Sequence, residues 1–233
     1  GTPLDVRVGV IVLEHHYRGF TEEAVRSALS QSLRPGCVLL STGDDRPYDI
    51  PGVRVQRLKT DSEGERLAAA VKDCPGVDAY ALLEDDDVWA PGHLERAARW
   101  LARGRVFYQS GTTPPMLPLG GNVSSVAFTA DLDLGKASSY PTLLGRALLL
   151  SAVEQRLTVV YDPEPTVIRR VHGQGLSVGR KGWWLEERDR LLRRLLEDFQ
   201  DGQAHELAYL YLLRDYGRGL RLRRAAGLLR WGL

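Results

Sequence analysis

Cysteine is scarce in this sequence, which has 2 cysteines among 233 residues. Cys37 falls in a predicted strand and Cys74 lies beside a predicted turn. Two cysteines cannot build a disulfide framework, and their spacing matches no cysteine-based metal site. The sequence therefore predicts a protein of the reducing cytosol.

Long hydrophobic runs and an excess of one charge are also missing. No apolar stretch approaches the roughly 20 residues that span a bilayer, and no charged segment with an apolar core stands at the start. We therefore expect a cytoplasmic protein in which the Asn122-Val123-Ser124 sequon is incidental. The formal net charge of +1 argues against general nucleic-acid binding, because such binding needs a concentrated basic surface.

The sequence does have a regular alternation of strand and helix patterns in its first half. Helix signals begin at Thr21, at the capping box of Ser62 with Glu65, and at Pro91. Runs typical of strands lie around them, at Arg7–Leu13, Cys37–Leu40, Val53–Leu58 and Ala79–Leu83. This alternation predicts βαβ units and a mainly parallel α/β sheet.

The second half of the chain is less regular. A loop rich in turn residues over Thr113–Gly121 precedes a predicted strand at Val126–Phe128. Further elements are then predicted: a helix over Thr142–Gln155, strands over Thr158–Tyr161 and Val167–Val171, and helices from Trp184 onward. With 43% hydrophobic and 26% charged residues, the composition fits one globular α/β unit with a small appendage.

Four consecutive carboxylates, Glu84 to Asp87, follow directly on the predicted strand Ala79–Leu83. Adjacent carboxylates repel one another and raise one another's pKa, so such a run needs solvent, a helix N-terminus or a cation. Ligands of open α/β sheets bind beyond the carboxyl ends of the strands, where this run lies. Two interpretations stay open: an oxygen-ligand site for Mg²⁺ or Mn²⁺, and acids stabilised by the helix that begins at Pro91.

Several segments carry a resemblance to a known family. They are VGVIVL near the start, AVRSALSQ, LLEDDDVWAPGHLE and VIRRVHGQGLS. The third is the most specific, with an apolar pair, an Asp-x-Asp type motif, and then Trp, Pro and Leu-Glu. Together they resemble the GT-A glycosyltransferases of the family 2 type. The resemblance implies a GT-A-like, Rossmann-type, mainly parallel sheet flanked by helices over residues 1–178, with a helical extension over residues 179–233.

Position by position, the resemblance also implies a metal site and a nucleotide site. It places Glu84 and Asp86 at the acidic positions of the motif, and His172 at a histidine that completes the metal site in some relatives, with Mn²⁺ or Mg²⁺ as the cofactor. The nucleotide would lie against the residues Leu13, Glu14, His15, Ser41, Gly43, Asp44, Asp85 and Arg66, with Arg170 as a further phosphate donor.

The reaction implied by the resemblance is sugar transfer from a nucleotide-diphosphate sugar, a UDP- or GDP-sugar, to an acceptor hydroxyl, with inversion. The acceptor would be a glycan or a lipid-linked sugar. Inverting relatives carry a general-base carboxylate before a helix, where this chain has Ser138–Thr142 and no acid. Asp131 and Asp133 are the nearest candidates for that base, and an acidic loop that caps Leu134-Gly135 is the alternative interpretation.

Two other functions compete with sugar transfer. A chain that keeps the nucleotide site and lacks a base would be a non-catalytic nucleotide- or glycan-binding module. A nucleotidyltransferase is disfavoured because the Gly-rich, Arg-containing loop expected after its first strand is missing. The turn Ser41-Thr42-Gly43-Asp44 also differs from the Asp-Asp-Gly-Ser type of the family, which leaves the preferred nucleotide base open.

The C-terminal tail is basic and rich in leucine. From Arg214 onward it holds six arginines and one acid. A basic helix with an apolar face can rest on anionic lipid, which would place the protein peripherally at the inner face of the membrane. The same leucines can instead pack against the catalytic domain or bind a partner protein.

Overall fold

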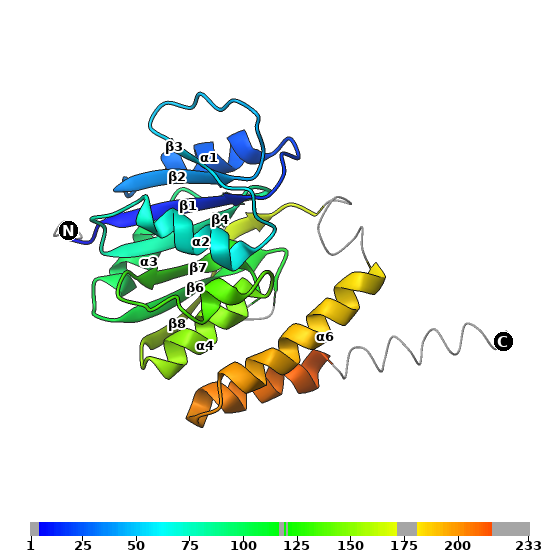
Figure 1. Ribbon diagram of the computed structural model, residues 1–233. Helices are drawn as coiled ribbons and strands as arrows, with labels where there is room; N and C mark the ends of the chain where they lie inside the picture. The colour runs from blue at the N-terminus through cyan, green and yellow to red at the C-terminus, as the bar shows by residue number, and fades with distance from the viewer. Residues whose placement is uncertain (1–4, 117–118, 120, 172–180, 216–233) are drawn as a thin grey trace, which may run out of the picture.

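The computed structural model describes residues 5–116, 119, 121–171 and 181–215 (Figure 1). The strands are β1 (Val8–Glu14), β2 (Cys37–Thr42), β3 (Arg54–Arg57), β4 (Ala79–Glu84), β5 (Asp87–Trp89), β6 (Val106–Thr113), β7 (Val126–Thr129) and β8 (Thr158–Arg169). The helices are α1 (Thr21–Leu29), α2 (Glu63–Lys72), α3 (His93–Leu101), α4 (Leu144–Glu154) and α6 (Lys181–Asp198), with the short 3₁₀ turns η1 (Val123–Ser125) and η2 (Ala137–Ser139). Residues 202–215 are also helical.

The strands form one eight-stranded sheet in the order β3-β2-β1-β4-β7-β6-β8-β5. The first four strands in that order run parallel, and β1 lies between β2 and β4. Every residue of β1 is buried, as expected of a parallel strand covered on both faces. Leu13 pairs with Ser41 on one side and with Glu84 on the other, so the ends of three strands meet at one edge.

The second half of the sheet corrects several sequence predictions. The two strands predicted over Thr158–Tyr161 and Val167–Val171 are one strand, β8, which pairs with β6 across two shifts in register. Proline cannot donate to a ladder, and Pro163 and Pro165 fall in this irregular part of β8. The strands β5 and β6 were not predicted, and Asp87, the last residue of the acidic run, begins β5 and pairs with Arg169.

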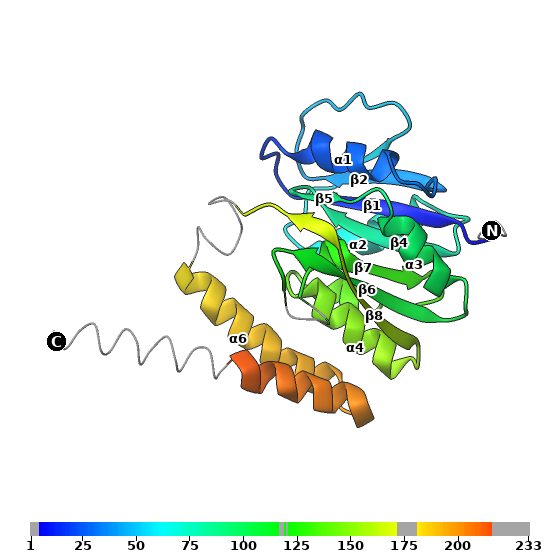
Figure 2. The ribbon, with the colours of Figure 1, turned by 180° about the vertical axis from the view of Figure 1, so that it is seen from behind.

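Alternation along β1 divides the core into two layers. Val8, Val10 and Val12 pack with residues of α1 and α3, whereas Ile11 and Leu13 pack with residues of α2 and α4. Figures 1 and 2 show these helix pairs on opposite faces of the sheet. This three-layer α/β arrangement confirms the predicted fold class.

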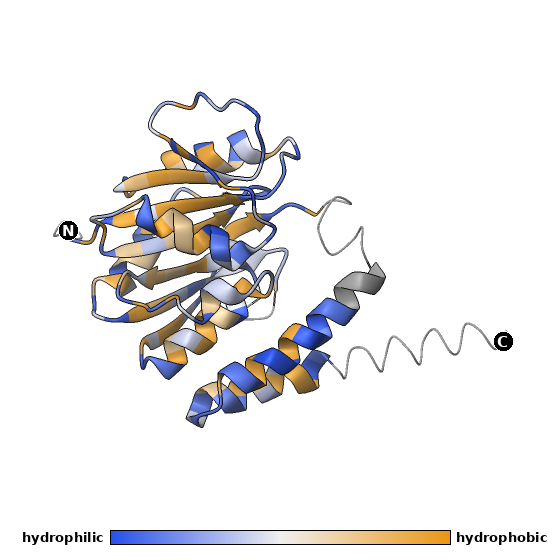
Figure 3. Ribbon diagram, in the orientation of Figure 1, coloured by the Kyte–Doolittle hydropathy of each residue, from blue (hydrophilic) through white to orange (hydrophobic). Residues whose placement is uncertain are grey.

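The C-terminal helices pack against the α2 and α4 side of the sheet. In Figure 3, α6 carries both hydrophilic and hydrophobic residues, while the strands are mostly hydrophobic. The apolar residues Leu191, Leu195 and Phe199 are fully buried in the same core cluster as α4. None of the helices among the described residues is long and apolar enough to cross a membrane. The tail on which the membrane prediction rests lies largely outside the described residues.

Candidate functional site

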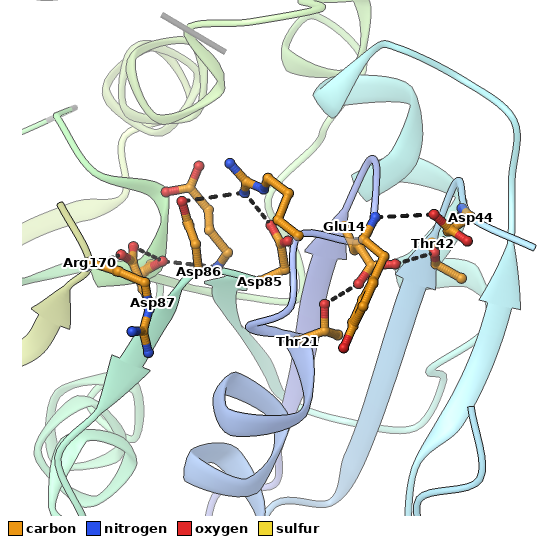
Figure 4. Close-up of polar contacts among 12 residues, drawn as sticks. Glu14, Thr21, Thr42, Asp44, Asp85, Asp86, Asp87 and Arg170 are labelled. Atoms are coloured by element: carbon orange, nitrogen blue, oxygen red, sulfur yellow. Dashed lines mark hydrogen bonds and ion pairs between the residues drawn. The ribbon is translucent and has the colours of Figure 1, made fainter. Parts of the chain in front are cut away.

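The acidic run lies where β4 ends and β5 begins (Figure 4). One oxygen from each of Glu84, Asp86 and Asp87 lies within 4.8 Å of the others. Asp87 is buried, whereas Glu84 and Asp86 are half-buried. Oxygen ligands are those that Mg²⁺ and Mn²⁺ prefer. These three carboxylates, called the acidic triad below, could therefore hold one such ion.

The electrostatics of the acidic triad favour a cation. Burial raises the pKa of Glu84 well above its usual range, and repulsion from Asp87, Glu63 and Asp86 adds to that shift. Burial likewise raises the pKa of Asp87, although hydrogen bonds from neighbouring side chains oppose the shift. Like charges that are partly removed from water are costly unless a positive charge compensates them.

Ser124 organises the acidic triad from the neighbouring turn η1. Its Oγ accepts a hydrogen bond of 2.9 Å from the backbone N–H of Glu84 and donates one of 2.6 Å to Asp87 Oδ2. Asn122 Nδ2 donates to the same oxygen at 3.2 Å. Asn122 is 7% exposed, so this residue of the sequon is buried beside the triad. Sequence reasoning missed Ser124 because no motif links η1 to the acidic run.

Asp85 is not part of the acidic triad and pairs with Arg18 instead. Its Oδ1 accepts a hydrogen bond of 2.7 Å from Arg18 Nη2, and the same nitrogen lies 3.3 Å from Asp86 Oδ2. Burial raises the pKa of Asp85 to about 7, although Arg18 opposes this shift. Asp87 therefore completes the cluster that a metal could use. Arg18 lies in a loop without a motif, 67 residues before Asp85, so no signal in the sequence links it to the acidic run.

Glu14, predicted to contact the nucleotide, has a fully buried carboxylate. It accepts hydrogen bonds from Thr42 Oγ1 at 2.6 Å, from Tyr48 Oη at 2.5 Å, and from Thr21. Figure 4 shows Glu14 between Thr21 and Thr42. Three hydroxyl donors satisfy this carboxylate, so the side chain of Glu14 holds the ends of β1 and β2 together.

The remaining residues predicted for the nucleotide gather beyond β1 and β2. A recess of about 250 Å³ opens there, lined by His15, His16, Gly43, Lys59, Thr60 and Asp61. A Cβ on Gly43 would lie 2.5 Å from the carbonyl oxygen of His15, so this close approach requires glycine. Asp44 accepts backbone hydrogen bonds from Tyr17 at 3.2 Å and from Arg46 at 2.9 Å, and thus fixes the turn.

Arg66 packs beneath the recess and holds its lining segments by hydrogen bonds. It is fully buried and donates to Ser41 Oγ at 3.2 Å and to the carbonyl oxygens of Leu58 and Thr60 at 3.0 and 2.9 Å. Burial, followed by the charge of Arg66, lowers the pKa of His15 to about 4, so His15 is neutral at pH 7. His15 Nδ1 and Arg66 Nε are buried and have no hydrogen-bond partner among the described residues.

Asp131 and Asp133, the residues predicted as candidates for the general base, do not lie at the carboxyl edge of the parallel strands. Thr129 of β7 pairs with Ala79 at the start of β4, so Asp131 and Asp133 lie beyond the sheet edge opposite Glu84. Asp131 forms an ion pair with Arg105, and Asp133 Oδ1 accepts from Gly135 N–H at 2.8 Å. This placement supports the capping interpretation and argues against a role as base.

Arg170 directly follows β8. The backbone N–H of Arg170 donates to Asp87 Oδ1 at 3.4 Å, while its guanidinium pairs with Glu23 and lies 4.3 Å from the ring centre of Phe20. The side chain of Arg170 therefore turns away from the acidic triad. His172 lies outside the described residues.

Comparison with known proteins gives matches in structure only. No sequence-family model matches the chain, and no curated protein matches it by sequence. Residues 1–349 of TarS from S. aureus, in complex with UDP-GlcNAc, match with a TM-score of 0.63 and 13% identity, covering 89% of this chain and 71% of that chain. A mannosyltransferase from Pyrobaculum calidifontis, PcManGT, in complex with GDP-Man and Mn²⁺, matches with a TM-score of 0.61 and 16% identity. The match covers 97% of this chain and 79% of that chain.

These matches establish the fold of the chain. It has the GT-A-type fold that the sequence predicted, with the acidic triad and the recess at the carboxyl edge of the parallel strands. The chain spans 43% of a longer TarS structure, which it matches with a TM-score of 0.58 and 12% identity. A fold of this kind supports many functions, so the function must be argued from the site.

Proposed function

We propose that this protein is a metal-dependent glycosyltransferase that moves a sugar from a UDP- or GDP-sugar to an acceptor hydroxyl. The observation that carries the proposal is the acidic triad of Glu84, Asp86 and Asp87, whose oxygens lie within 4.8 Å of one another at the edge where β1 and β4 end. TarS matches in complex with UDP-GlcNAc and PcManGT in complex with GDP-Man and Mn²⁺, which supports donors of this class.

The residues present fit a Mn²⁺ or Mg²⁺ ion. The triad offers three carboxylates and no soft ligand, which suits these hard cations. Glu84, Asp86 and Asp87 would hold the ion, with His172 as a further proposed ligand. When bound, the ion would neutralise the charge that develops on the diphosphate as the bond to the sugar breaks.

The protein's own residues would bind and orient the donor. The recess at His15, Gly43 and Thr60 is smaller than a typical pocket of about 300 to 1,000 Å³, which suits one part of a nucleotide, such as its base. Leu13 and Ser41, the last residues but one of β1 and β2, pair with each other beside it. Arg18, which lies against Asp85 and Asp86, carries the charge to contact a phosphate oxygen once a cation compensates these acids.

We assign catalysis to residues 1–178 and treat residues 179–233 as a helical extension. Inversion at the transferred sugar follows the family 2 type of mechanism. The acceptor is proposed to be a glycan or a lipid-linked sugar, because the basic, leucine-rich tail from Arg214 onward would suit contact with anionic lipid.

A nucleotide-binding module without catalysis is the second candidate. It is favoured by the absence of any acid in Ser138–Thr142, the segment in which inverting relatives carry their base. Such a module would bind a nucleotide with a metal and would not break the bond between sugar and diphosphate.

The test is calorimetric binding of UDP and GDP with and without Mn²⁺, followed by donor turnover. Asp86→Ala should abolish the metal-dependent part of nucleotide binding. Glu206→Ala is the matched control, because it removes one acid from an exposed position on a distant helix. Release of sugar from UDP-GlcNAc or GDP-Man would exclude the binding module. Nucleotide binding that is equal with and without Mn²⁺ would refute the metal-dependent proposal.

A further inference from the structure

Several polar groups in the wall of the recess beyond β1 and β2 already have partners within the protein. Thr60 Oγ1 donates to Glu65 Oε2 at 2.6 Å, and the carbonyl oxygen of Thr60 accepts from Arg66 Nη2 at 2.9 Å. The carbonyl oxygen of Gly43 accepts from Lys59 Nζ at 2.8 Å. These groups hold the wall together, so recognition of a ligand falls to the other polar groups of the lining.

Lys59 and Asp61 line the recess and keep hydrogen-bonding capacity. The ammonium group of Lys59 donates to Gly43 O and lies 3.0 Å from Asp45 Oδ1. An ammonium group has three donors, so one N–H of Lys59 remains for a ligand. Asp61 is exposed, and its carboxylate has no hydrogen bond or ion pair with another of the described residues. Its two oxygens therefore offer a pair of adjacent acceptors.

The imidazoles of His15 and His16 also line the recess. His15 Nδ1 is buried and has no hydrogen-bond partner among the described residues. A neutral imidazole has one donor and one acceptor, on separate ring nitrogens. Neither histidine can supply two adjacent acceptors, so among the side chains of the lining this pair belongs to Asp61.

The four common bases differ in the polar edge that they would present to Lys59 and Asp61. Guanine has the acceptor O6, then the donor N1–H, then the donor N2 amino group. Uracil has an acceptor, a donor and a second acceptor, while adenine and cytosine have an amino donor followed by an acceptor. One donor from Lys59 and two acceptors from Asp61 complement all three groups of guanine. Uracil would instead place a carbonyl oxygen against a carboxylate oxygen, which leaves both without a partner.

We propose that the recess selects guanine, and that Asp61 is the residue that determines this specificity. The inference rests on the proposed glycosyltransferase function and narrows its donor to a GDP-sugar. The Asp61 carboxylate would accept from N1–H and from the N2 amino group, while Lys59 would donate to O6. Two parallel hydrogen bonds to one carboxylate give geometric specificity as well as affinity.

The experiment measures calorimetric binding of GDP, UDP and inosine diphosphate with Mn²⁺. Inosine diphosphate lacks the N2 amino group. A hydrogen bond to a charged group is worth about tenfold or more in affinity. In wild type, UDP and inosine diphosphate should therefore each bind at least about tenfold more weakly than GDP. Asp61→Asn should bring GDP and UDP to within about threefold of each other.

Asp45→Asn is the matched control for Asp61→Asn. Asp45 is also an exposed acid beside Lys59, and it does not line the recess. Removing either acid reduces the repulsion of a diphosphate, so the ratio of the two dissociation constants is compared rather than either constant alone. The ratio for UDP over GDP should stay within about twofold of wild type in Asp45→Asn.

Xanthosine diphosphate provides a gain of binding that a misfolded variant could not show. Its base has a carbonyl group in place of the N2 amino group of guanine. An asparagine can accept from N1–H and donate to that carbonyl oxygen. Relative to UDP, xanthosine diphosphate should therefore bind about tenfold more tightly to Asp61→Asn than to wild type. The inference is overturned if wild type binds UDP as tightly as GDP, or if Asp61→Asn leaves the preference for GDP intact.

The inference and the proposed function can fail separately. If wild type binds UDP with Mn²⁺ as tightly as GDP and releases sugar from UDP-GlcNAc, only the selection of guanine is wrong. If wild type binds no nucleotide, the glycosyltransferase function is wrong and the inference falls with it. If GDP is preferred through Asp61 and neither donor is cleaved, the selection of guanine holds and catalysis is refuted.

Discussion

Arg18 Nη2 lies 2.7 Å from Asp85 Oδ1 and thereby divides the acidic run into two parts. Asp85 is neutralised by a cation of the protein itself, while the oxygens of Glu84, Asp86 and Asp87 converge on one point. The same guanidinium nitrogen lies 3.3 Å from Asp86 Oδ2, so Arg18 also adds positive charge beside the proposed metal site.

We predict that Arg18→Ala tightens the binding of Mn²⁺ alone. Removing a positive charge near the acidic triad removes its repulsion of a divalent cation, which should be worth about 1.4 kcal/mol or more, or roughly tenfold in affinity. Binding of UDP or GDP with Mn²⁺ should weaken, because a phosphate donor is lost. Calorimetry measures both quantities, with Arg99→Ala on the exposed face of α3 as the control. Weaker binding of Mn²⁺ alone would contradict this account of the charges.

Ser124 provides a second prediction. In Ser124→Ala, the Glu84 N–H loses its acceptor and Asp87 loses its shortest hydrogen bond, so the free energy of unfolding should fall by about 1 to 3 kcal/mol. Affinity for Mn²⁺ should fall about tenfold, because outer hydrogen bonds orient metal ligands. Denaturant titration and calorimetry measure the two effects.

Ser125→Ala is the matched control for Ser124→Ala. Ser125 is also fully buried, and its Oγ accepts from Gln109 at 3.0 Å and donates to Asn122 O at 2.7 Å, without contacting the triad. It should lose similar stability and keep its affinity for Mn²⁺. Equal losses of affinity in both variants would show that Ser124 has no specific role in orienting the acids.

The parallel half of the fold could be predicted because its signals are local. β1 is a continuous apolar run that is buried along its length, and Ser62 caps α2 as the capping box predicted, with its Oγ accepting from Glu65 N–H at 3.2 Å. The second half could not be predicted as well, since β5 and β6 pair with β8 through contacts that are distant in sequence. Tertiary pairing outweighs local propensity there.

In the candidate site, too, the features with local sequence signals were predicted and those that depend on contacts distant in sequence were not. The acidic run was visible because four carboxylates are adjacent in the sequence, and their place at the sheet edge followed from the strand that precedes them. The partners Arg18 and Ser124 come from two other segments of the chain, and no sequence motif links either of them to the acidic run. Their roles depend on distances that only the folded chain defines.

Gly64 provides a prediction about the start of α2. Alanine is normally preferred to glycine within a helix by about 1 kcal/mol, but a Cβ at Gly64 would lie 2.5 Å from Ala137 O. Gly64→Ala should therefore destabilise the protein by about 1 to 3 kcal/mol through overpacking. Gly92→Ala is the control, because a Cβ there meets nothing within 4 Å, and it should cost at most about 1 kcal/mol as an N-cap change. Thermal unfolding compares the two, and a Gly64→Ala variant as stable as wild type would contradict the close packing.

His93 links stability to pH. It is fully buried, stacks on Trp89 at 4.3 Å and contacts Thr166 Oγ1 at 2.7 Å. Burial lowers its pKa from 6.5 to about 3, against the attraction of Asp162. The unfolded chain therefore binds the proton more tightly, so the stability from neutral His93 is complete above pH 6.5 and is lost as the pH falls. Relative to His93→Gln, wild type should lose about 2 kcal/mol of unfolding free energy between pH 6.5 and about pH 5. Subtracting the unfolding free energy of His93→Gln from that of wild type removes the contribution of the buried acids, whose raised pKa values change stability with pH in the opposite direction. Denaturant titrations at each pH measure both values. A difference between the two proteins that stays constant from pH 6.5 to about pH 5 would contradict the prediction.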